Sequence, residues 1–256
     1  MKRLQVVDLV RTFAIVIVIA RHLGGVYIVS PSHPLFLAYL WFRLWASGNY
    51  GVTLFFVVSG FVISRLIAAQ PGGLFNPSYK YFYSRRIGRI FPLLILICLI
   101  GITVVSFFPK QSGAFEYVFQ DIHRPLTSSF WISVATFSFN WYQIFSPNSY
   151  IGLSWTILWS LAVEEQFYLF YPLVLKRLRN EKKLTLFLIV VIILGPLMTE
   201  VIKFFFHDLI FSEHNSFENF SFIAIGCLLY LVSTRYEEFL SKNKKRCVQF
   251  CLFGLA

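Results

Sequence analysis

The chain has 256 residues, of which 57% are hydrophobic and 19% aromatic. Only 14% are charged, against about 25% in soluble domains, and the mean hydropathy is +0.67. This composition excludes a soluble globular protein and predicts an all-α, polytopic bundle of transmembrane helices. The net charge of +11 does not indicate nucleic acid as a partner. The basic residues cluster between long apolar runs, as they do in the cytoplasmic loops of membrane proteins.

A transmembrane helix needs about 20 mostly apolar residues. Six segments are candidates for such spans. They are residues 9–29, 50–69, 90–108, 151–175, 184–206 and 217–233. Another apolar run begins at Cys247 and stops at Ala256. A further candidate span, residues 127–145, is interrupted by Ser, Thr, Asn and Gln. The sequence therefore predicts about six to seven spans.

Three segments between the predicted spans are basic. Residues 64–89 carry five bases and no acid, residues 176–183 five bases and one acid, and residues 234–246 five bases and two acids. The positive-inside rule places these segments in the cytoplasm, together with the N-terminus. This assignment has the correct parity only if residues 127–145 do not cross the membrane. We therefore predict a re-entrant or interfacial helix there, on the outer side, with protein or a cavity around its backbone.

The first span carries ionisable residues, although an Arg near the centre of a membrane helix costs at least ~2.5 kcal/mol. Arg11 and His22 are eleven residues apart. At about 3.6 residues per turn, both leave the same helix face, separated by ~16 Å. One interpretation is structural: Arg11 reaches to the membrane surface and His22 makes a helix-packing hydrogen bond. The other is functional, with both side chains facing a buried polar site.

A cluster of arginines, Arg85, Arg86 and Arg89, lies where a basic loop enters the third span. Arg86 and Arg89 are three positions apart and therefore lie on adjoining faces of a helix. These residues are either ordinary positive-inside residues or a phosphate-binding site, for which guanidinium groups are well suited.

Two adjacent carboxylates, Glu164 and Glu165, fall near the middle of an otherwise aromatic span. At that depth they must face a polar cavity or cationic partners, and the arginines are the obvious partners. A purely structural ion pair is the alternative to a functional role. Ser59, in the second span, could act as a nucleophile, but no neighbouring base follows from the sequence. A helix contact through small residues is favoured there.

The four cysteines lie in or beside apolar segments, form no Cys-x-x-Cys pair and have no His at a metal-ligand spacing. We expect them to be small buried hydrophobic residues, with neither a disulfide framework nor a metal site.

Four stretches of the sequence occur in a characteristic order. They are DLVRTFAIVIVIARH in the first span, GVTLFFVVSGF in the second, RRIGRIFP at the third, and LSWTILWSLAVEEQFYLFYP further on. Together they resemble the membrane-bound acyltransferase-3 family of bacterial O-acetyltransferases. Members of that family transfer an acyl group, usually acetyl from cytoplasmic acetyl-CoA, to a sugar hydroxyl at the cell envelope. The resemblance implies that His22, in a motif with Arg11, is catalytic, and that Arg86 and Arg89 handle the acyl donor.

The chain also departs from the pattern of that family. Thr53 stands where Asp is typical, and Leu9 and Thr12 replace common glycines. Typical members have more spans than this sequence predicts. We therefore expect residues 1–256 to form a single membrane acyltransferase domain that lacks the C-terminal spans of the family.

The working hypothesis is a membrane O-acyltransferase that uses acetyl-CoA as co-substrate and no metal. The phosphates of acetyl-CoA would meet Arg85, Arg86 and Arg89. His22, whose charge changes near neutral pH, would take a proton from the acceptor hydroxyl as general base.

The remaining charged residues of the spans would assist this chemistry. Arg11 would stabilise donor or oxyanion charge, and Glu164 or Glu165 would orient His22 or balance the arginines. The acceptor would be an envelope glycan, reached from the bacterial inner membrane. Lipopolysaccharide O-antigen, peptidoglycan, exopolysaccharide and a small lipid-linked sugar are all compatible. Two alternatives remain: a transporter or flippase with a buried polar pathway, and an inactive fragment that acts as a scaffold.

Overall fold

The computed structural model describes residues 5–27, 48–107, 127–145, 155, 157–206 and 213–253, and the elements in these residues are helices. They are α1 (Gln5–Tyr27), α3 (Gly48–Ala68), α4 (Tyr79–Phe107), α6 (Ser128–Ala135), α7 (Phe139–Phe145), α9 (Leu158–Leu178), α10 (Glu181–Phe206) and α12 (Ser216–Phe253). The predicted all-α fold is confirmed for this part of the chain. Each of the six predicted spans overlaps one of the long helices.

Within the residues that the structure describes, four helices are long and apolar enough to cross a membrane. The stretches are Gly48–Ala68, Tyr79–Thr103, Glu181–Phe204 and Ser216–Glu237. The chain is therefore a polytopic helical membrane protein. Helix α9, with 21 residues, does not belong to these four, because Glu164, Glu165 and Gln166 lower its hydropathy. Helix α1 has 23 residues, but the side chains of its last turns lie outside the described residues, so it is not counted in this group.

Helix α3 lies between α1 and α12 because small residues let the helices approach closely. A Cβ atom added to Gly60 would lie 1.9 Å from the carbonyl oxygen of Ile223 on α12. The reciprocal contact has the same geometry, since a Cβ atom on Gly226 would lie 1.9 Å from the carbonyl oxygen of Val57. Two backbones thus meet without side chains between them, and this crossing fixes α3 as one wall of the site described below.

Two clusters of buried side chains hold the remaining helices together. The larger joins α3, α9, α10 and α12 around Phe56, Tyr171 and Ile223. The smaller joins α4 and α9 to the α6–α7 segment around Trp155, whose ring leaves so little space that a Cβ atom on Gly101 would lie 2.4 Å from it. Helix α4 keeps much of its apolar surface exposed, as expected of a helix in lipid.

Residues 127–145 form two short helices, α6 with eight residues and α7 with seven. Thr127 caps the first helix by accepting a hydrogen bond from the Phe130 amide. The two are separated at Phe137, whose φ of 53° is the left-handed conformation that interrupts a helix. A helix of eight residues is about 12 Å long, much shorter than the ~30 Å hydrocarbon layer of a bilayer.

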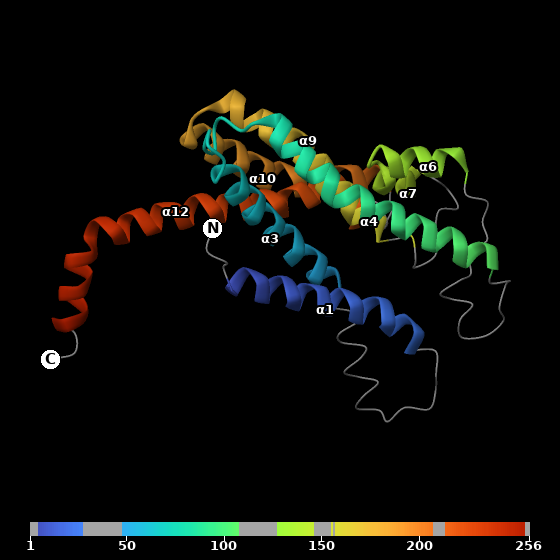
Figure 1. Cartoon of the computed structure of the whole chain (residues 1–256), viewed down its shortest axis with the longest axis horizontal. Coiled ribbons are helices and arrows are strands. Elements are labelled where there is room, and N and C mark those ends of the chain that lie inside the picture. The colour runs from blue at the N-terminus through green and yellow to red at the C-terminus, as the bar shows by residue number, and fades with distance from the viewer. Residues whose placement is uncertain are drawn as a thin grey trace.

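Figure 1 shows the basic segments of the chain at one end of the helical bundle. The start of α1, the turn between α3 and α4 and the turn between α9 and α10 lie toward the left of this view. The short helices α6 and α7 lie toward the opposite end, beside α4. The basic turns and the α6–α7 segment therefore lie at opposite ends of the bundle along its long axis.

Candidate functional site

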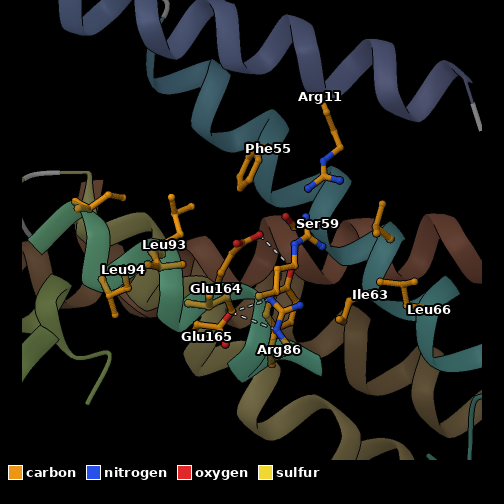
Figure 2. Close-up of a pocket in the computed structure, with 16 residues that line it drawn as sticks. Arg11, Phe55, Ser59, Ile63, Leu66, Arg86, Leu93, Leu94, Glu164 and Glu165 are labelled. Atoms are coloured by element: carbon orange, nitrogen blue, oxygen red, sulfur yellow. Dashed lines mark hydrogen bonds and ion pairs between the residues drawn. The ribbon is translucent and has the colours of Figure 1, made fainter. Parts of the chain in front are cut away.

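A cavity of about 240 Å³ lies between α1, α3, α4 and α9, and we call it the inner cavity (Figure 2). Its charged lining residues are Arg11, Arg86, Arg89, Glu164 and Glu165. The rest of the lining is mostly aliphatic. Five of the seven residues singled out from the sequence thus line one space, although they come from three helices far apart in the chain.

Arg86 is held by two contacts with α9. Its Nη2 atom lies 2.7 Å from Oε1 of Glu165, and its Nε atom lies 3.3 Å from the same oxygen. The guanidinium carbon lies 3.6 Å from the centroid of the Tyr168 ring, a close cation–π contact. The side chains of Arg86 and Glu165 are only 19% and 12% exposed. This pair is therefore largely desolvated, and loss of either partner would leave a buried charge without its counter-charge.

Glu164 differs from its neighbour in its partners. Its Oε1 atom accepts a hydrogen bond of 3.0 Å from the Tyr168 hydroxyl, and the Ser59 hydroxyl lies within hydrogen-bonding reach. Glu164 is 8% exposed and lines the inner cavity. The two glutamates thus have separate environments: Glu165 neutralises Arg86 directly, whereas Glu164 is held by neutral hydroxyls.

Gln166, the next residue of α9, connects the site to the α6–α7 segment. Its side-chain amide donates to the Phe137 carbonyl at 2.6 Å and to Oδ1 of Asn140 at 2.8 Å, while its oxygen accepts from the Ser216 hydroxyl of α12. The bond to Phe137 fixes the turn at which the short helices separate. Gln166 therefore ties this turn to the helix that carries Glu164 and Glu165.

Arg11 reaches the inner cavity from α1, and Figure 2 shows its side chain pointing into the space between the helices. Its guanidinium carbon lies 5.9 Å from the centroid of the Phe55 ring on α3. His22 lies in the last turns of α1, but its side chain lies outside the described residues. Its catalytic role therefore stays a prediction.

A second cavity of about 450 Å³, the outer cavity, opens beside the turn between α3 and α4. Arg85 lines this cavity and not the inner one, with its guanidinium carbon 4.8 Å from the centroid of the Tyr81 ring. Arg86 and Arg89 line both cavities. The inner and outer cavities therefore adjoin at Arg86 and Arg89. A long ligand with an anionic part could extend past this pair from one cavity into the other.

No group of three His, Cys, Asp or Glu side chains that could hold a metal ion occurs among the described residues. The chemistry available in the inner cavity is that of guanidinium, carboxylate and hydroxyl groups. This set can bind anions, stabilise a developing negative charge and accept a proton.

The sequence alone does not identify Tyr168 as a site residue, and it does not predict that Ser59 lines the site. Tyr168 stands four residues after Glu164, the spacing at which helical side chains meet, so this contact is one that the sequence could have indicated. The sequence favours a small helix-contact residue at Ser59. Ser59 does lie beside the close α3–α12 crossing, but it also lines the inner cavity next to Glu164.

The fold and the site define a polytopic helical membrane protein with a cavity between its helices that is lined by guanidinium, carboxylate and hydroxyl groups. The family described as an acyltransferase domain matches residues 4–256, and the chain belongs to this acyltransferase-3 family. The resemblance carried by the four sequence stretches is thereby confirmed. No solved structure matches the chain.

The relatives to which this chain is similar include the following three bacterial proteins. The O-acetyltransferase OatA of Staphylococcus aureus is 29% identical over 224 residues, which cover 83% of this chain and 35% of the relative. The peptidoglycan O-acetyltransferase OatA of Listeria monocytogenes is 31% identical over 189 residues, 70% of this chain and 26% of the relative. The putative peptidoglycan O-acetyltransferase YrhL of Bacillus subtilis is 32% identical over 137 residues, 51% of this chain and 20% of the relative. The chain thus spans about a third or less of the length of these relatives.

Proposed function

We propose that this chain carries the membrane part of an O-acetyltransferase, which moves an acetyl group from acetyl-CoA to a hydroxyl group of a cell-wall glycan. The observation that carries the proposal is the junction of the two cavities at Arg86 and Arg89. An extended donor can place its phosphates in the basic outer cavity while its thioester reaches the inner one. Family membership favours this reaction over a transporter or a scaffold.

The donor phosphates would meet Arg85 and Arg89 first. Both line the outer cavity, where charge-assisted hydrogen bonds to phosphate oxygens can form. Arg86 is already paired with Glu165, so it adds little net charge to donor binding. It would contribute by directing its remaining N–H groups toward the donor. This division of roles supports binding of an anionic donor without placing an uncompensated charge deep between the helices.

His22 would act as general base toward the acceptor hydroxyl. Arg11, about three helical turns away on the same face of α1, would stabilise negative charge on the donor. Glu164 is the better placed of the two glutamates to support this chemistry, because it lines the inner cavity without a direct ion pair to Arg86. The thioester C–S bond breaks as the new ester C–O bond forms, and the acceptor proton leaves through the base to the CoA thiolate.

The acceptor proposed first is peptidoglycan, because two of the relatives are named as peptidoglycan O-acetyltransferases or putative ones. Peptidoglycan lies outside the cytoplasmic membrane, whereas acetyl-CoA lies inside. The proposal therefore needs a topology with six spans, a cytoplasmic N-terminus and a non-spanning α6–α7 segment on the outer side. The shortness of these two helices and the clustering of the basic turns at the opposite end support that topology (Figure 1).

The test is acetyl transfer by the purified protein in nanodiscs, with labelled acetyl-CoA and a soluble peptidoglycan fragment as acceptor. The H22A variant should lower kcat by at least ~100-fold, the usual contribution of a general base, while acetyl-CoA still binds. V16A, at an exposed position of the same helix, should retain full activity. Full-rate acetylation by H22A would refute the role of His22, and failure of the wild-type protein to acetylate any envelope glycan would refute the function.

A further inference from the structure

Tyr168 is a buried residue of α9 to which neither the sequence nor the family comparison assigned a role. It is 3% exposed and lines the inner cavity between α3 and α4. Two groups of opposite charge contact different parts of its side chain. The ring face receives the Arg86 guanidinium at 3.6 Å, and the hydroxyl donates to Oε1 of Glu164 at 3.0 Å.

The contact at the ring constrains Arg86 in a way that Glu165 alone cannot. Glu165 accepts from the Nε and Nη2 edge of the guanidinium and fixes that edge. The Tyr168 ring covers one of the two faces, so the plane of the group cannot rotate about the ion pair. Since an Arg side chain has about 2 kcal/mol of rotamer entropy to lose, a guanidinium fixed before the ligand arrives binds it at a smaller entropic cost.

The contact at the hydroxyl constrains Glu164. A carboxylate without an ion pair has several accessible rotamers, and the hydrogen bond from Tyr168 with Ser59 nearby selects one of them. Since Tyr168 and Glu164 are four residues apart on α9, this bond runs along one face of a single helix and does not depend on the position of other helices.

We propose that Tyr168 is a positioning residue with two separable functions: its ring orients Arg86 for the acyl donor, and its hydroxyl orients Glu164 toward the inner cavity. The inference rests on the proposed function, because it names the residue that organises the same site. Tyr168 itself takes no part in bond making, and its ring and hydroxyl should therefore affect different kinetic constants.

The matched control is Tyr171, one turn further along α9. Tyr171 is 2% exposed, and its hydroxyl lies 2.8 Å from the hydroxyl of Ser64 on α3, so it is an equally buried tyrosine that also reaches α3. It lines neither cavity. Loss of its hydroxyl should affect packing but not the orientation of Arg86 or Glu164.

The experiment compares Y168F, Y168L and Y171F in nanodiscs, with acetyl-CoA and a soluble peptidoglycan fragment as substrates and acetyl-CoA binding measured separately by calorimetry. Y168F keeps the ring, so we expect acetyl-CoA binding within about twofold of wild type and kcat about tenfold lower, the effect of one hydrogen bond to a charged group. Y168L also loses the ring, and acetyl-CoA should bind about tenfold more weakly. Y171F should change neither constant by more than about twofold.

The outcomes separate this inference from the function on which it rests. A wild-type protein that binds no acetyl-CoA overturns both. If the wild type binds and transfers acetyl, the inference is overturned by any of three results. These are unchanged kcat in Y168F, equal acetyl-CoA binding in Y168L and Y168F, and losses in Y171F that match those in Y168F. The expected split between binding and kcat, absent from Y171F, would support it.

Discussion

The ion pair between Arg86 and Glu165 allows a quantitative prediction of stability. Its nearest nitrogen and oxygen atoms lie 2.7 Å apart. Two unit charges with centres about 4 Å apart attract each other by about 4 kcal/mol at an effective dielectric constant of about 20. E165Q removes this attraction and leaves the 19%-exposed Arg86 side chain without its counter-charge. Because some water still reaches the pair, we expect a loss of about 3 kcal/mol, at the lower end for a broken buried pair.

The assay is thermal unfolding in detergent, followed by intrinsic fluorescence. Since 1 kcal/mol corresponds to about 2–4 °C for a domain of this size, the Tm of E165Q should fall by about 6–12 °C. The matched control is E181Q, which breaks the pair between α10 and α12 formed by Glu181 and Arg235. Those side chains are 39% and 58% exposed, so the control should lose at most about 1 kcal/mol.

A second variant tests the assumed cause of the E165Q effect. The double variant R86Q/E165Q removes the buried charge along with its partner, so it should recover part of the lost Tm. Equal shifts in E165Q and E181Q would refute the reasoning, because they would mean that burial adds nothing to the pair between α4 and α9. A double variant less stable than E165Q would refute it as well.

Two further predictions follow from the fold. G60A and G226A should each lower the Tm by about 6 °C or more, because a Cβ atom would lie 1.9 Å from a backbone oxygen across the α3–α12 crossing. The control is G88A, whose Cβ atom would meet nothing within 4 Å. It should be neutral or slightly stabilising in the same unfolding assay. A reporter enzyme fused after Ser146 should score as extracytoplasmic, because α6 and α7 are too short to cross a bilayer; a cytoplasmic score would overturn the predicted topology.

Much of this fold is predictable from the sequence because hydropathy and loop charge report directly on the bilayer. Apolar runs of about 20 residues locate the six long helices. Polar interruptions, together with the parity that the basic loops require, set residues 127–145 apart from the spanning segments. The turn at Phe137 is not predictable, because a bulky residue with a positive φ is stabilised by a tertiary contact, the hydrogen bond from Gln166 to its carbonyl.

The composition of the site is also predictable, but its pairing is not. Charged residues in apolar spans are costly enough that Arg11, Arg86 and the two glutamates have to face a shared polar space, and they do line one cavity. Which glutamate meets Arg86 depends on the rotation of α9 relative to α4. Adjacent helical residues point about 100° apart, and only the packing of several helices fixes that rotation.

This difference of direction along α9 explains how the site can be both charged and stable. Glu164, Glu165 and Gln166 leave the helix in three directions and meet the Ser59 region of α3, Arg86 of α4, and the α7–α12 contact, respectively. Helices α3, α4, α7 and α12 are therefore each anchored to α9 by a polar contact at the same level. A rotation of α9 that improved one contact would break the other two.

The same arrangement sets the charge that a ligand would meet. Three arginines and two glutamates line the inner cavity, so these five side chains carry a small positive excess, and Arg85 adds to it in the outer cavity. Because Glu165 compensates Arg86, the attraction on an approaching anion comes mainly from Arg85 and Arg89, at the side of the basic turn. An anionic donor would therefore be drawn to the outer cavity first, and only its less charged end would gain by continuing past Arg86 toward Glu164.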